Sequence, residues 1–96
     1  MDPEIISIHM QSLHSRMIAL QIKQTHTMYL LMDSETQLSL IMNQYAETGE
    51  YALQPADRLR VADLNMSITE YKEALNSIMS EVESLQQSVS RLAGRA

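Results

Sequence analysis

The chain has 96 residues, enough for one small domain, and its 12 acidic and 7 basic residues give a net charge of −5. Hydrophobic residues make up 45% of it, too large a share for a disordered tail. The absence of Cys excludes a disulfide scaffold, a thiolate zinc site and a thiol nucleophile. Two Gly and two Pro are too few for a turn-rich β-sandwich or barrel. The composition therefore predicts an all-α protein.

The first element is expected to be a long helix over about residues 3–47. Asp2 suits the N-cap position and Pro3 the first helical position, and no Gly or Pro follows before residue 48. One ambiguity lies inside this segment, because Ser34 and Gln37 have the spacing of a capping box. The helix either breaks near residue 33 or continues there, and we favour a continuous or gently kinked helix.

A loop over about residues 48–54 separates this helix from a second one. Gly49 suits the position just beyond a helix C-terminus. Pro55 and the acidic Asp57 then favour the start of a second helix over about residues 55–93. Two long helices joined by a short loop predict a single antiparallel helical hairpin.

The second helix carries an unbroken heptad pattern of apolar residues, with alternating steps of three and four. Its positions are Val61, Leu64, Ile68, Tyr71, Leu75, Ile78, Val82, Leu85, Val89 and Leu92. The flanking positions are mostly uncharged, so packing shape rather than ion pairing is expected to select the partner of this seam.

The first helix has a seam of the same period, but polar residues interrupt its centre. The register is Ile6, Met10, Leu13, Met17, Leu20, Gln24, Thr27, Leu31, Ser34, Leu38, Ile41 and Tyr45. A second apolar stripe runs along the same helix, so one facing helix cannot cover both. We therefore expect a protein partner, either another copy of the chain or a second helical protein. The predicted interface residues are Ile18, Ile22, Met28, Tyr29, Met32, Leu75, Ile78, Val82, Leu85 and Val89.

Nothing in the sequence predicts an enzyme, a metal site or a cofactor. The histidines His9, His14 and His26 are five and twelve residues apart, which does not place two rings on one helix face. No nucleophile-elbow or phosphate-loop motif occurs, and the paired carboxylates lie outside the seam. The acidic balance and dispersed Arg residues also make the chain a poor nucleic-acid binder.

The chain lacks the features of a secretory signal and of a membrane span. Its first residues are acidic, and no window of eighteen apolar residues occurs. We therefore expect a protein that is either cytoplasmic or exported by a dedicated secretion system.

The long periodic helix over roughly residues 55–93 contains the motifs Pro55-Ala56-Asp57 and Ile68-Thr69-Glu70-Tyr71. With these motifs, this part of the chain resembles the needle and inner-rod subunits of type III secretion systems. The resemblance implies a small helical hairpin that is exported and polymerises into a tube. The alternative is a small chaperone or adaptor that holds a partner's amphipathic helix, as secretion chaperones do.

Overall fold

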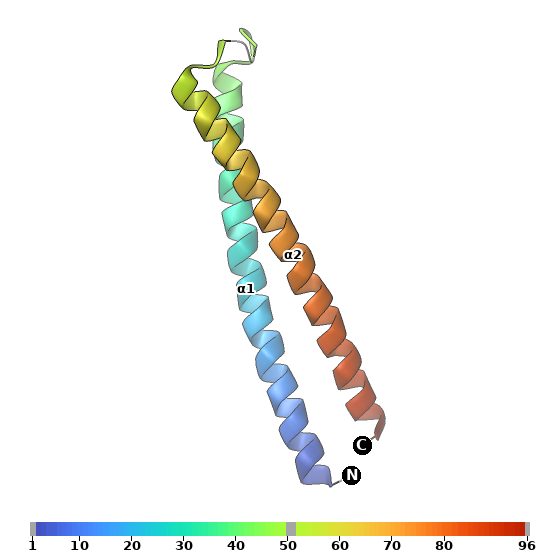
Figure 1. Ribbon diagram of the computed structural model, residues 1–96. Coiled ribbons are helices and arrows are strands. Elements are labelled where there is room, and N and C mark those ends of the chain that lie inside the picture. The colour runs from blue at the N-terminus through green and yellow to red at the C-terminus, as the bar shows by residue number, and fades with distance from the viewer. Residues whose placement is uncertain (1, 50–51, 96) are drawn as a thin grey trace. The chain divides into compact units, whose positions relative to one another are not determined.

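A computed structural model describes residues 2–49 and 52–95. It contains two long helices, α1 (Pro3–Gln44) and α2 (Pro55–Arg95), which run antiparallel and pack against each other (Figure 1). No strand occurs in the described ranges. The predicted all-α helical hairpin is confirmed.

The N-terminus of α1 is capped as the sequence predicts. The backbone N–H of Glu4 donates to Oδ1 of Asp2 at 3.0 Å, which satisfies one of the free donors of the first turn. Pro3 occupies the first helical position, where a missing N–H costs no hydrogen bond. These local signals fix where the helix begins.

α1 continues without interruption through the possible break near residue 33. The side chain of Gln37 donates from Nε2 to Oδ2 of Asp33 at 2.8 Å, one turn back along the helix. Thr36 donates from its hydroxyl to the carbonyl of Met32, also at 2.8 Å. The polar residues of this segment thus form bonds one turn apart along a continuous helix. Of the two alternatives, the continuous helix is the one observed.

The turn between the helices is held by a left-handed glycine and a side-chain bond. Gly49 has a φ of 81°, and its N–H donates to the carbonyl of Tyr45 at 2.8 Å. The hydroxyl of Tyr45 donates to Oδ2 of Asp57, in the first turn of α2, at 2.5 Å. α1 therefore ends at Gln44, three residues before the expected boundary, and its chain turns toward α2.

The hydrogen bond between Tyr45 and Asp57 predicts a pH-dependent contribution to stability. The bond to the carboxylate raises the pKa of Tyr45 above its usual value of 10.0, and partial desolvation and the carboxylate's charge act in the same direction. Because the folded-state pKa is the higher one, this contribution is complete below pH 10.0 and is lost as the pH rises through the raised pKa. We expect Tyr45→Phe to lower the melting temperature at pH 7 and to abolish this loss at alkaline pH. Thermal unfolding of both proteins across pH 7–11 measures it, and parallel curves would contradict it.

The contacts of the chain divide into two units. The terminal unit contains residues 1–26 and 75–96, and the turn unit contains residues 27–74. Ile78 and Leu85 are the buried apolar side chains described in the terminal unit, and Ile41 and Ile68 are those of the turn unit. Each unit therefore has a thin core of two side chains with half-buried residues around it.

Both predicted seams face inward within these units. All twelve positions of the α1 register and all ten of the α2 register are buried or half-buried. The polar residues at the centre of the α1 seam, Gln24, Thr27 and Ser34, follow the same pattern, and Thr27 and Ser34 are buried. Ser and Thr hydroxyls can form hydrogen bonds with the backbone of their own helix. Among the described residues, no buried side-chain nitrogen or oxygen lacks a hydrogen-bond partner, so the seam tolerates these polar residues.

Candidate protein–protein interface

The outer α1 stripe, which we define as Ile18, Ile22, Tyr29 and Met32, faces away from the seam. These four side chains are 57–68% exposed. Ile18 and Ile22 lie one turn apart in the terminal unit, and Tyr29 and Met32 lie about one turn apart in the turn unit. Full burial of a large apolar side chain stabilises a folded protein by about 1.5–3 kcal/mol. Because these four side chains are mostly exposed, they contribute little of this stabilisation to the hairpin.

The ten predicted interface residues divide into an exposed set and a seam set. Met28 belongs with the outer α1 stripe in the exposed set, at 46% exposure. The five residues predicted on α2 lie instead in the seam of the terminal unit: Leu75, Ile78, Val82, Leu85 and Val89. Ile78 and Leu85 are buried there, and the other three are half-buried. A partner would reach the buried Ile78 and Leu85 only by displacing α1.

Residues that could support catalysis or metal binding are dispersed. His9, His14 and His26 are all exposed on α1. Within residues 2–49 and 52–95, no three His, Asp or Glu side chains gather where they could hold a metal ion.

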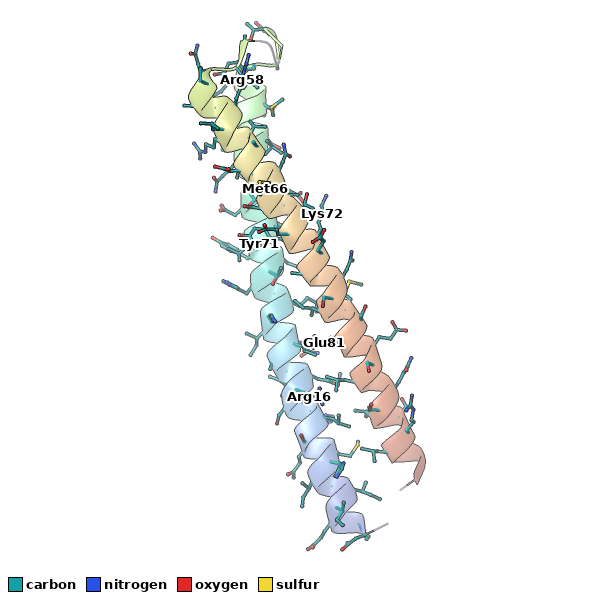
Figure 2. All side chains as sticks on the ribbon, viewed as in Figure 1. Arg16, Arg58, Met66, Tyr71, Lys72 and Glu81 are labelled. Carbon is teal, nitrogen blue, oxygen red and sulfur yellow. The ribbon has the colours of Figure 1, made fainter. Side chains whose placement is uncertain are left out.

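A groove that the sequence analysis missed lies in the terminal unit. It measures about 530 Å³, and α1 and α2 both contribute to it. Its lining residues are Ile8, His9, Ser12, Leu13 and Arg16 from α1, and Ser88, Arg91 and Leu92 from α2. We name it the basic groove, and Arg16 marks its α1 side in Figure 2. In the sequence, Arg16 and Arg91 are 75 positions apart, so only the register between the helices brings them to one site.

Charge is distributed unequally between the two units. The turn unit holds eight of the twelve acidic residues and three of the seven basic ones, so it carries the whole net charge of −5. The terminal unit is neutral, with four residues of each sign, and all three histidines belong to it. The basic groove is therefore a local cationic site in a neutral unit.

Neither described helix is long and apolar enough to cross a membrane. Comparison with protein-family models, curated proteins and solved structures gives no match to this chain. The class of protein is therefore defined by its own structure, as an all-α helical hairpin with an uncovered apolar stripe on α1.

Proposed function

We propose that the protein is a non-enzymatic assembly subunit that associates with further copies of itself. The observation that carries this proposal is the exposure of the outer α1 stripe. Grouped exposed apolar side chains on a small protein mark interaction sites, whereas single ones are ordinary. In each unit, two large side chains lie about one turn apart on the side of α1 that α2 does not cover, which is the pattern of an unfilled helix–helix interface.

The thin core of each unit supports the same proposal. Two buried apolar side chains per unit contribute little, since small domains hide only a modest share of their apolar surface. Association would bury the outer α1 stripe in addition and would stabilise the folded hairpin by mass action. Stability that rises with protein concentration is the expected accompaniment of this function.

A role in a type III secretion apparatus is the more specific form of the proposal. It is supported by the resemblance over residues 55–93, a range that coincides with most of α2. In the motif Ile68-Thr69-Glu70-Tyr71, Ile68 is buried and Tyr71 half-buried in the seam, while Thr69 and Glu70 are exposed. The motif thus supplies both packing residues and an accessible polar pair.

A small chaperone or adaptor is the alternative function, and the grooves of the terminal unit favour it. Besides the basic groove, a second groove of about 790 Å³ is lined by Gln24, Met79 and Val82, among others. Open grooves between two helices are the kind of site that receives an amphipathic helix of a partner. Such a protein would remain small when pure and would copurify with one partner at a fixed ratio, whereas an assembly subunit forms large species alone.

The test of the proposal replaces three of the four residues of the outer α1 stripe by charged residues. We expect the triple variant Ile18→Glu, Ile22→Lys and Tyr29→Glu to keep its helicity, because all three positions are exposed and the first two changes form an opposite-charge pair one turn apart. Its mass by multi-angle light scattering should fall to that of a smaller species, because charges cannot be buried in an apolar contact without a partner.

A matched control places the same charges on the outward face of α2. Ser77→Glu, Glu81→Lys and Ser84→Glu are also exposed, and the first two are likewise one turn apart. This control should retain the mass of the wild type, while circular dichroism reports the helicity of all three proteins. A wild type that is a monomer at every concentration, or a stripe variant of unchanged mass, would show the proposal to be wrong.

A further inference from the structure

The outward side of α2 in the turn unit carries an acidic and apolar face. Five exposed side chains recur there in steps of four and three residues, so they share one side of the helix, opposite its seam. They are Leu59, Asp63, Met66, Glu70 and Glu73, which we name the acidic face. Met66 and Glu70 also line a shallow hollow on this side, and Met66 is labelled in Figure 2. No Lys or Arg lies among these positions.

The basic groove of the terminal unit presents the complementary chemistry. Arg16 and Arg91 supply two exposed positive charges, and neither forms a hydrogen bond or ion pair with the described residues. Ile8, Leu13 and Leu92 supply apolar surface beside them. The groove therefore combines unpaired cations with apolar side chains, as the acidic face combines carboxylates with apolar side chains.

We propose that the basic groove of one copy receives the acidic face of a second copy. This inference rests on the self-association proposed above and names the surfaces of one contact in it. Met66 would pack against the apolar residues of the groove, while Glu70 and Glu73 would lie near Arg16 and Arg91. Such an arrangement removes apolar surface from water and pairs the four charges at the same time.

Dimensions and charge both favour a second copy as the occupant. The α1 part of the groove, residues 8–16, covers roughly 12 Å of helix, and residues 63–73 of the acidic face cover about 15 Å, at a rise of 1.5 Å per residue. The net charge of −5 in the turn unit also attracts it toward an exposed pair of Arg residues on a neutral unit. Since every copy carries one groove and one face, these contacts either close a ring or extend a row of copies.

Two charge-reversed variants test the contact. The groove variant carries Arg16→Glu and Arg91→Glu, and the face variant carries Glu70→Arg and Glu73→Arg; all four positions are exposed helix sites, so folding should be kept. Each variant alone should show a dissociation constant for self-association raised by roughly a hundredfold or more, because like charges then oppose each other. Sedimentation velocity over a range of concentrations measures this change.

Mixing the variants separates charge pairing from general damage. In the mixture, the intact groove of the face variant meets the intact acidic face of the groove variant, and the two reversed surfaces also carry opposite charges. The two variants should therefore associate with each other at a 1:1 ratio. A protein with all four substitutions should regain self-association, since its charges are again opposite. The control is Lys23→Glu with Lys72→Glu, which changes the net charge of the chain as much as the groove variant but lies outside both surfaces.

The outcomes distinguish this contact from self-association in general. Unchanged mass of the groove and face variants, together with dissociation of the outer-stripe variant, would overturn the contact and leave the proposed function standing. A mixture in which the two variants do not associate would also overturn the contact. A wild-type protein that is monomeric at all concentrations would overturn both proposals.

Discussion

Ile78→Ala is expected to lower the free energy of unfolding by about 2–5 kcal/mol. Ile78 is 3% exposed, the least of the described apolar side chains in the core, and it lies in the seam of the terminal unit. Removing three methyl or methylene carbons there leaves a cavity that the two helices cannot fully close, so packing is lost together with the hydrophobic gain. Urea unfolding followed by circular dichroism measures the change.

The matched control is Ile18→Ala on the outer α1 stripe. Ile18 is 57% exposed, so the same change of atoms should shift the free energy of unfolding of the isolated hairpin by no more than about 0.5 kcal/mol. The pair is best compared at a concentration where the chain is monomeric, because association would stabilise the wild type through Ile18. Equal losses for the two variants would contradict the burial pattern on which the fold rests.

Glu35→Pro is expected to destabilise the protein by about 3 kcal/mol or more. Glu35 is exposed in the interior of α1, where proline removes one backbone hydrogen bond and its ring collides with the preceding turn. If a helix instead began with Ser34 as its N-cap, residue 35 would be the first helical position, where proline is favoured. The substitution therefore distinguishes a continuous helix from two helices more sharply than a change at the seam would.

The matched control here is Glu35→Ala, which keeps the backbone donor and the helix propensity. It should be nearly neutral, because Glu35 is exposed and no ion pair of its side chain is described. Thermal unfolding and the helical signal at 222 nm of both variants give the comparison. A proline variant as stable as the alanine variant would place a helix boundary at Ser34.

The hairpin could be predicted from sequence because its determinants are local or periodic. Asp2, Pro3, Gly49 and Pro55 mark helix ends through backbone chemistry, and the heptad steps mark the sides that face inward. Even the polar residue Ser34 follows the heptad period and is buried, so its position in the seam decided its burial more than its polarity did. Ser34 and Gln37 have the spacing of a capping box, but Gln37 instead donates to Asp33, four residues earlier in the same helix. A cap and such a bond within a helix use the same residue types.

The surfaces could be predicted only in part. Periodicity identified the outer α1 stripe, because exposure on a helix follows from the face opposite the seam. It could not decide whether Leu75 and Val89 would pack within the chain or against a partner, since both use the same apolar face. The basic groove could not be predicted because it depends on which α2 residue lies opposite Arg16. The turn and the whole seam together set this register between the two helices.

The net negative charge of the chain is confined to residues 27–74, so charge is distributed unevenly along it. A positively charged support, such as an anion-exchange resin, attracts the protein chiefly through these residues. The neutral remainder of the chain contributes no net charge to this attraction.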